Sequence, residues 1–173
     1  IGSTGDDTLL GDATDNFFSG GLGNDSLDGG AGNDTIDYSY ITDPSQSLSI
    51  SLAVTVPVTV SLAPGDVDTI VGFENVFGGA GNDTLVGAGG PNILMGGGGD
   101  DSLSGAAGFD TFVGGLGNDT IDGGAGFDSL DYAYLGDAGR TISLVGAGLF
   151  ITASVLSAGA PDNDLVRNVE AIA

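Results

Sequence analysis

Aspartate recurs at the sixth place of a nine-residue unit that occurs ten times in the chain. The unit has the form Gly-Gly-x-Gly-x-Asp-x-U-x, where U is a large apolar residue, and its clearest copies are residues 20–28, 29–37 and 114–122. Carboxylates fixed beside tight glycine turns offer hard oxygen atoms to a divalent cation. A strict nine-residue period with aspartate at the sixth place is typical of a calcium-binding parallel β-roll. The spacing therefore predicts a metal and a fold together.

Sixth-place carboxylates two units apart, such as those of Asp101 and Asp119, are expected to repel one another in such a fold. Two units would make one coil, and successive coils stack about 4.8 Å apart. Two like charges at about 5 Å repel by about 3 kcal/mol at an effective dielectric constant of about 20. A divalent cation between successive turns would remove this repulsion. Oxygen ligands with no His or Cys nearby favour Ca²⁺ over transition metals, and glycine carbonyls suit its flexible coordination better than that of Mg²⁺.

Each unit supplies the elements that would position these carboxylates. Its first six residues can form a turn, because glycine tolerates positive φ angles, and its last three can form a short strand. The eighth place is expected to point into the core. The eighth-place residues are Leu9, Phe18, Leu27, Ile36, Leu85, Leu94, Leu103, Phe112, Ile121 and Leu130. No segment has a convincing helical period, so the sequence predicts an all-β chain with almost no helix.

The units fall into two blocks that are separated by β-rich inserts. The expected organisation is a block of four units in residues 1–37, an insert in 38–77, a block of six units in 78–131, and a second insert in 132–173. The two inserts share features: the Asp68-to-Glu74 string parallels Asp164 to Glu170. The chain is thus expected to be a segment of a longer protein in which a block-plus-insert module repeats.

The first insert contains a period-two stretch in residues 49–62, with Ile, Leu and Val on one face and mainly Ser, Thr and Ala on the other. This pattern predicts half-buried strand. Pro57 cannot donate a ladder hydrogen bond, so it marks an edge or a break into two strands. We expect the inserts to continue the coil rather than to fold as separate flaps.

Composition excludes several classes of function. The chain has 24 acidic and 2 basic residues and a net charge of −22; two acids are glutamates, so the other 22 are aspartates. Binding to nucleic acid or to an anionic membrane needs clustered Lys and Arg, so neither is expected, and no stretch is long and apolar enough for membrane insertion. Without Cys or His there is no thiol nucleophile, disulfide or imidazole acid–base chemistry.

On these motifs the chain resembles the RTX (repeats-in-toxin) family of bacterial secreted proteins, and the similarity covers both blocks. The resemblance implies a parallel β-roll, or β-solenoid, in which each Ca²⁺ is bound by sixth-place side chains and glycine-turn carbonyls from units two apart. Carried onto this sequence, the sixth places are Asp7, Asn16, Asp25, Asp34, Asp83, Asn92, Asp101, Asp110, Asp119 and Asp128. The implied glycines are Gly20, Gly29, Gly78, Gly96, Gly114 and Gly123.

Asn16 and Asn92 depart from the pattern, since an amide supplies an oxygen but no charge. The Asn16–Asp34 and Asn92–Asp110 sites are therefore expected to be weak or empty. Pairing of units two apart allows about six calcium sites, two in the first block and four in the second.

Other side chains have two interpretations each. Phe109 and Phe127 occupy the fifth place and would form either an exposed docking patch or a surface covered by the following insert. The Tyr38/Tyr40 and Tyr132/Tyr134 pairs at the block exits would be a structural lock or a carbohydrate-stacking site. Arg140 and Arg167 are expected to pair with nearby carboxylates.

The expected function is that of a calcium-dependent structural module of a bacterial extracellular surface, filament or adhesin protein, exported by type I secretion and folded on Ca²⁺ binding. Its partners would be neighbouring repeats of the same longer chain, with self-assembly at the cell surface left open. The alternative is an accessory module of a secreted enzyme such as a lipase, protease or polysaccharide-modifying enzyme. No catalysis is expected within this segment. A cytolytic toxin is disfavoured because there is no lysine to acylate.

Overall fold

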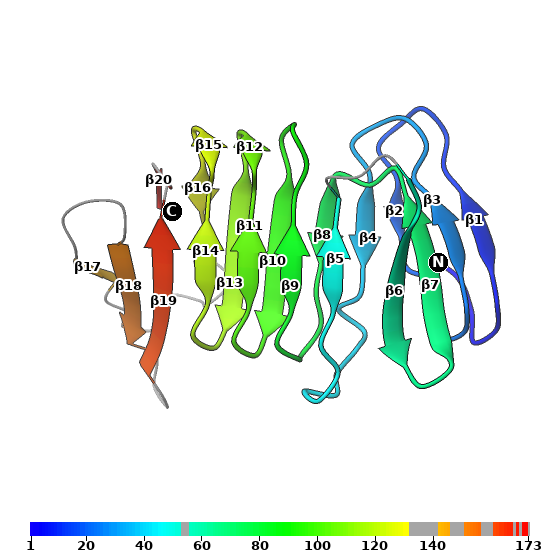
Figure 1. Ribbon diagram of the computed structural model, residues 1–173, viewed down its shortest axis with the longest axis horizontal. Helices are drawn as coiled ribbons and strands as arrows, with labels where there is room; N and C mark the ends of the chain where they lie inside the picture. Colours follow the sequence, from blue (N-terminus) through cyan, green and yellow to red (C-terminus); the bar gives the residue numbers. More distant parts are fainter. Residues whose placement is uncertain are drawn as a thin grey trace.

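The computed structural model describes residues 1–52, 56–131, 142–145, 151–156, 161–167, 169 and 171–172. In these residues the regular structure consists of β-strands, and the expectation of an all-β parallel roll is confirmed (Figure 1). None of the described segments is a helix with the length and apolar character needed to cross a bilayer.

Most strands of the nonapeptides have two or three residues, as predicted. In the first block and the first insert they are β1 (Thr8–Leu10), β2 (Phe17–Phe18), β3 (Ser26–Asp28), β4 (Thr35–Asp37), β5 (Ser49–Ser51), β6 (Val58–Ala63), β7 (Asp66–Val71) and β8 (Asn75–Phe77). In the second block they are β9 (Thr84–Val86), β10 (Ile93–Gly98), β11 (Ser102–Ser104), β12 (Ala107–Gly108), β13 (Thr111–Leu116), β14 (Thr120–Asp122), β15 (Ala125–Gly126) and β16 (Ser129–Leu130). Strands β17 (Ile142–Val145), β18 (Ile151–Leu156), β19 (Pro161–Arg167) and β20 (Ala171–Ile172) follow. Two nonapeptide strands differ from the expected division into turn and strand: β10 and β13 have six residues and continue into the following glycine turn. Two further short strands, β12 and β15, lie within turns.

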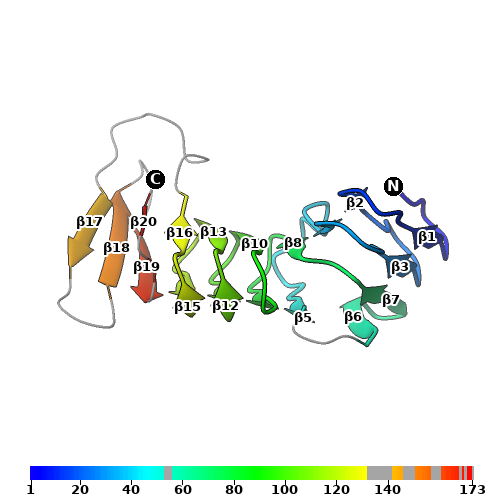
Figure 2. The same ribbon diagram turned by 90° about the horizontal axis from the view of Figure 1, so that it is seen from above.

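Within the blocks, strands two units apart pair in parallel, so one coil contains eighteen residues. Leu9 is opposite Leu27, and Leu103 is opposite both Leu85 and Ile121. One face of the roll is a seven-stranded sheet, β2-β4-β8-β10-β13-β16-β20, that runs through both blocks. The other face is divided into two sheets, β1-β3-β7-β6 and β17-β18-β19-β14-β11-β9-β5 (Figure 2).

The first insert joins the two blocks. Strand β5 pairs with β9 of the second block, β7 pairs with β3 of the first, and β8 lies between β4 and β10. These three strands are parallel to their neighbours and continue the roll. Strand β6 instead runs antiparallel to β7, and Pro57 stands directly before it, in the break between β5 and β6 that the sequence predicts.

The core lies between the two faces and consists of eighth-place side chains. Leu27, Ile36, Leu85, Leu94, Leu103, Phe112, Ile121 and Leu130 are buried. Insert residues extend this row, since Ile50, Ile70, Val76 and Val166 are buried and stand in register with it. Leu9 and Phe18, in the first coil, are only partly buried. Each fully buried aliphatic side chain contributes about 1.5–3 kcal/mol to stability, so the core stabilises the roll along its length.

Candidate metal centre

The turns of the roll bring the sixth-place side chains into columns. In the turns that begin at residues 20, 29, 96, 114 and 123 the second and fourth places have positive φ, as at Gly115 (+117°) and Gly117 (+130°), and glycine tolerates this conformation because it has no Cβ. Each turn thereby reverses the chain within six residues and directs its sixth-place side chain towards the neighbouring coil.

In six of the turns, the sixth-place aspartate accepts a hydrogen bond from the backbone of the coil before it; these are Asp25, Asp34, Asp101, Asp110, Asp119 and Asp128. The N–H of Asp83 donates to Oδ1 of Asp101 at 2.7 Å, and the N–H of Asp101 donates to Oδ1 of Asp119 at 2.9 Å. The same bond, between 2.7 and 2.9 Å, joins Asp7 to Asp25, Asn16 to Asp34, Asn92 to Asp110 and Asp110 to Asp128. This bond uses one carboxylate oxygen and leaves the other for a different partner.

The second carboxylate oxygen is buried in several of these turns. The Oδ2 atoms of Asp25, Asp34, Asp101, Asp110 and Asp119 accept no hydrogen bond from any residue that the structure describes. Burial of an ionised oxygen without a partner is costly. Loss of solvation, with a smaller contribution from neighbouring aspartates, raises the pKa of Asp101 to about 8 and that of Asp119 to about 7. Burial also raises the pKa of Asp25, Asp83 and Asp110.

Backbone carbonyl oxygens lie beside these carboxylate oxygens. A Cβ at Gly96 would meet both Oδ2 of Asp101 and the carbonyl oxygen of Gly114. The carbonyl oxygens of Gly20, Gly29, Gly96 and Gly123 take the same position beside Asp7, Asn16, Asp83 and Asp110, respectively. Gly78 lines the space beside Asp83 with its Cα. First-place glycine is therefore required, because a side chain would fill the space between the oxygens. We call each such space a cell. Its lower side chain is the sixth-place residue of one coil, and its carbonyl and its upper side chain belong to the next coil along the roll.

The cells fit a calcium ion chemically. A cell between two aspartates, such as that of Asp101 and Asp119, offers carboxylate oxygens from two coils and at least one backbone carbonyl, the hard ligands that Ca²⁺ takes in sets of about 6–8. Within the described part of the chain, no group of three or more His, Cys, Asp or Glu side chains could hold a metal. A metal ion in a cell would therefore need backbone carbonyl oxygens to complete its coordination.

The turns that open each block differ from those that follow. The second-place N–H donates to the sixth-place side chain at Asp7 (2.6 Å, from Ser3) and at Asp83 (2.8 Å, from Gly79). Asn16 and Asn92 accept the same bond, from Asp12 and Ala88. In the later turns the second place has positive φ instead, at Gly21, Gly30, Gly97, Ala106, Gly115 and Gly124. The two asparagines thus lack a charge and also have their oxygen engaged.

Three acids outside the nonapeptides extend the columns, and the sequence pattern missed them. The N–H of Asp25 donates to Asp68, that of Asp34 to Glu74, and that of Asp119 to Asp164, at 3.0, 2.8 and 2.9 Å. Their separations of 43, 40 and 45 residues do not follow the eighteen-residue repeat. One feature of the sequence could have identified these acids. In both inserts an aspartate and a glutamate stand six residues apart, Asp68 with Glu74 and Asp164 with Glu170, and these are the only glutamates in the sequence.

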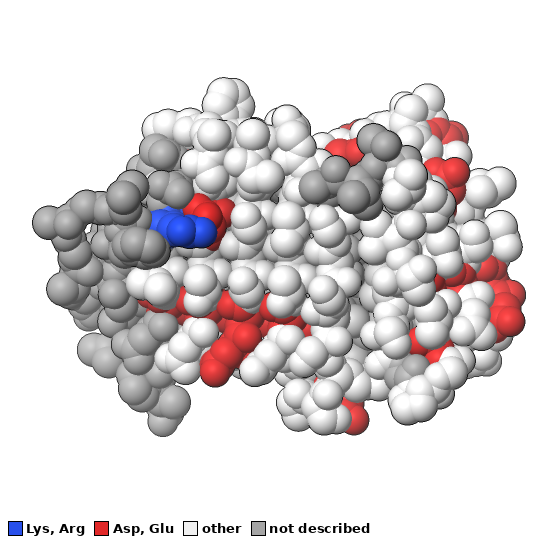
Figure 3. Space-filling model, in the orientation of Figure 1, with Lys and Arg blue, Asp and Glu red and all other residues white. Residues whose placement is uncertain are grey.

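Fifth-place side chains form a second ladder that the sequence analysis also missed. Asp100 Oδ1 accepts from the N–H of Asn118, and Asn82 Oδ1 accepts from the N–H of Asp100. In two other turns the fifth place holds an aromatic ring instead, that of Phe109 or Phe127. These side chains are 70% and 61% exposed, so the described residues of the second insert do not cover them. Figure 3 shows acidic side chains in a row across the surface of the second block.

The tyrosines at the exit of the first block make contacts that favour a structural lock. Tyr38 is buried and donates its hydroxyl hydrogen to Oδ2 of Asp68, while Tyr40 donates to the carbonyl oxygen of Gly21. Arg167 forms the expected ion pair, with Asp122 (Figure 3). Tyr132, Tyr134 and Arg140 lie outside the described residues.

The repeat pattern of the chain matches a known protein family. The family model of the RTX calcium-binding nonapeptide repeat matches four copies, at residues 1–36, 68–103, 77–112 and 95–130. No curated protein matches the chain. Among solved structures, the extracellular lipase LipA from Serratia marcescens is similar at 17% sequence identity with a TM-score of 0.40. That match covers 98% of this chain and 37% of the lipase.

Proposed function

The chain belongs to the RTX calcium-binding nonapeptide repeat family, and on that premise we propose that it is a calcium-dependent structural module of a bacterial extracellular surface, filament or adhesin protein. Membership makes it a calcium-binding structural module of a secreted protein. The role at the surface, the individual ligands and the number of sites are the parts that we propose.

The observation that carries the proposal is the row of buried Oδ2 atoms that have no hydrogen-bond partner among the described residues, each beside a glycine turn. The proposed calcium ligands are the sixth-place aspartates with the carbonyl oxygens of the next coil's first-place glycines. When bound, Ca²⁺ supplies positive charge to paired carboxylates that otherwise repel one another by several kcal/mol.

Folding of the chain is then coupled to the calcium concentration. Each coil binds its neighbours through the hydrogen bonds of the aspartate columns and through one row of core side chains, so the coils are stabilised cooperatively. At low calcium the aspartate charges oppose stacking and favour an expanded chain that can be exported. At high extracellular calcium the folded state is stabilised by mass action.

A role as a spacer or surface element is supported by the shape of the fold. The seven-stranded sheet from β2 to β20 extends through both blocks and makes an elongated body (Figure 1). At the end near β1 and β2, Leu10 and Phe17 are exposed, and Leu9 and Phe18 are only partly buried. Neighbouring repeats of the same longer chain are the proposed partners at this open edge, because further parallel coils would cover these side chains.

Far-ultraviolet circular dichroism during calcium titration tests the proposal. We expect a cooperative change from coil to β structure with Ca²⁺, reversal by a chelator, and little response to Mg²⁺. A β spectrum that is indifferent to the chelator would overturn the coupling of folding to calcium. For the surface role, we expect small-angle scattering of the calcium-bound chain to show a rigid rod. A compact, concentration-independent sphere would contradict it.

A further inference from the structure

We infer that Asp34, Gly72 and Glu74 form an additional cation-binding cell at the junction of the two blocks, and that this cell couples the folding of one block to the other. The inference rests on the proposed calcium-driven folding. It concerns residues that the nonapeptide pattern does not include, because Gly72 and Glu74 lie in the first insert.

A regular cell in the second block provides the standard for comparison. In the cell between Asp101 and Asp119, Oδ2 of Asp101 is buried without a hydrogen-bond partner among the described residues. The carbonyl oxygen of Gly114 lies beside it, across the space that Gly96 leaves open. The N–H of Asp101 donates to the carboxylate of Asp119 at 2.9 Å. A regular cell therefore has three features: a carboxylate oxygen without a hydrogen-bond partner among the described residues, a carbonyl oxygen from the next coil, and a second carboxylate from that coil that a backbone N–H holds in place.

The junction reproduces all three features. Asp34 is completely buried, and its Oδ2 has no hydrogen-bond partner among the described residues. A Cβ at Gly29 would meet both this oxygen and the carbonyl oxygen of Gly72. The N–H of Asp34 donates to Oε2 of Glu74 at 2.8 Å. Gly72 thus replaces a first-place glycine, and Glu74 replaces a sixth-place aspartate.

The substitution of glutamate for aspartate follows from the shorter turn. Only Gly72, Phe73 and Glu74 separate β7 from β8, where a regular turn has six residues. Gly72 reverses the chain with φ at +73°, and Phe73 is buried against Phe18 with ring centroids 5.8 Å apart. The extra methylene of glutamate lets a carboxylate reach the position that the longer turn provides for aspartate.

The next space along the same column is closed by hydrogen bonds. Asn92 accepts the N–H of Ala88 through Oδ1 and donates from Nδ2 to the carbonyl oxygen of Glu74 at 2.6 Å. This space therefore holds a donor hydrogen where a cation would need an acceptor. The column of the first block extends through Glu74 and stops there.

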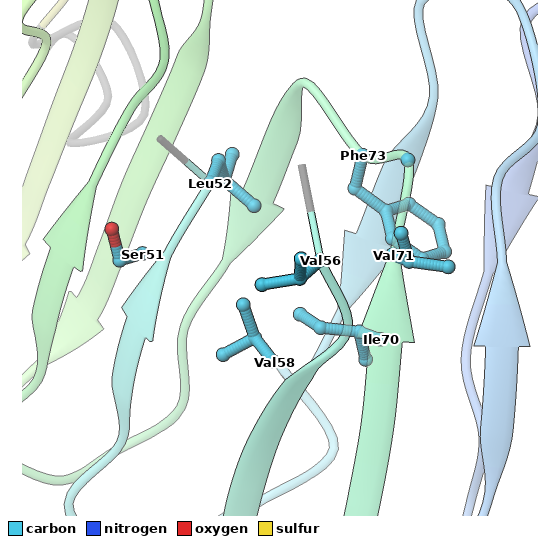
Figure 4. Close-up of a pocket in the computed structure, with 8 residues that line it drawn as sticks. Ser51, Leu52, Val56, Val58, Ile70, Val71 and Phe73 are labelled. Carbon is cyan, nitrogen blue, oxygen red and sulfur yellow. The ribbon is translucent and has the colours of Figure 1, made fainter. Parts of the chain in front are cut away.

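The junction cell lies where the connection between the blocks is thin. Strand β8 joins β4 to β10 in the continuous sheet. On the opposite face the sheets are separate, and a small pocket whose lining includes Ser51, Val58 and Phe73 lies between β5 and the β6–β7 hairpin (Figure 4). A cation held between Asp34 and Glu74 would cross-link the last coil of the first block to the insert that begins the second. Both blocks would then fold in one transition.

The test compares Glu74→Gln with Asp43→Asn in the intact chain. Glutamine keeps an oxygen that can accept the N–H of Asp34 but removes the charge. Asp43 is exposed, and among the described residues its side chain accepts hydrogen bonds only from Ser45 in its own turn. Its variant therefore makes the same change in charge away from the columns. Isothermal titration counts the Ca²⁺ bound, and hydrogen-exchange mass spectrometry follows residues 17–37 and 93–122 separately during the titration.

For the parent chain and Asp43→Asn we expect equal stoichiometry and one shared calcium midpoint for the two segments. For Glu74→Gln we expect one Ca²⁺ fewer, and a midpoint for residues 17–37 that rises by about tenfold while that of residues 93–122 stays in place. Unchanged stoichiometry and a shared midpoint in Glu74→Gln would overturn the junction cell. Failure of the parent chain to fold with calcium would instead overturn the proposed function, so the two failures are distinguishable.

Discussion

Tyr38 donates its hydroxyl hydrogen to Oδ2 of Asp68 at 3.1 Å across 30 residues of chain. In regular turns this second oxygen of the column carboxylate is left for another partner; at Asp68 a tyrosine takes it. Burial raises the pKa of both groups, that of Asp68 to about 6. The hydrogen bond therefore ends the column of Asp7 and Asp25 with a side chain and anchors the β6–β7 hairpin to the first block.

Removal of this hydroxyl should destabilise the chain. We expect Tyr38→Phe to lower the free energy of unfolding in saturating calcium by about 1–3 kcal/mol, because Asp68 would retain a buried oxygen with no donor. Urea denaturation followed by circular dichroism measures this free energy of unfolding. Tyr40→Phe is the matched control. The Tyr40 hydroxyl donates to a backbone carbonyl at a half-buried position, so its removal should lower the free energy of unfolding by less. Equal stability of Tyr38→Phe and the parent would show that the bond does not anchor the hairpin.

A methyl group placed in a cell should remove calcium binding there. Gly96→Ala would put a Cβ against Oδ2 of Asp101 and the Gly114 carbonyl, so we expect at least one Ca²⁺ fewer per chain and a higher calcium midpoint. Gly89→Ala is the control, because a Cβ at Gly89 meets no atom within 4 Å. Titration calorimetry compares the two variants. Identical binding by both would mean that the space at Gly96 is not a metal cell.

The regular parts of the fold follow from local repetition, which is why the sequence predicts them. The nine-residue spacing determines the parallel register of Leu85, Leu103 and Ile121 and the stacking of Asp101 on Asp119, because identical units make identical contacts. The junction could not be predicted in this way. Asp68 and Glu74 reach their columns through a hairpin and a three-residue turn, and their separations from Asp25 and Asp34 depend on insert length. The burial of Tyr38 against Asp68 likewise arises from packing of distant segments.

One turn contains a residue that its backbone disfavours. Ala106 has φ at +72° in the second place, where neighbouring turns have glycine, and the left-handed conformation costs an L-residue about 1–2 kcal/mol. Glycine relieves this strain but adds about 0.5–1 kcal/mol of unfolded-state entropy. We expect Ala106→Gly to raise the free energy of unfolding by about 0.5–1 kcal/mol. Ala107→Gly, in strand β12, should lower it by a similar amount, and a loss in both variants would contradict the strain at Ala106.

In the absence of calcium, protonation of the buried carboxylates should partly stabilise the fold. The pKa of Asp101 is raised from 3.8 to about 8 and that of Asp119 to about 7, chiefly by burial. Between about pH 4 and pH 8 the folded, metal-free chain therefore binds more protons than the unfolded chain, and its stability falls as the pH rises. With a chelator present, we expect β structure by circular dichroism to be greatest near pH 4 and to decline towards pH 8. Asp101→Asn should make this decline shallower.

Saturating calcium should reverse the sign of this dependence. Calcium binds the ionised carboxylates and competes with protons for them, so the calcium-bound chain should gain stability over the same interval from about pH 4 to pH 8. Urea midpoints measured at both ends of the interval, with calcium and with chelator, compare the two slopes directly. Slopes of the same sign would show that the ion does not bind at the buried carboxylates of Asp101 and Asp119. The two slopes have opposite signs only if calcium and protons compete for the same oxygens.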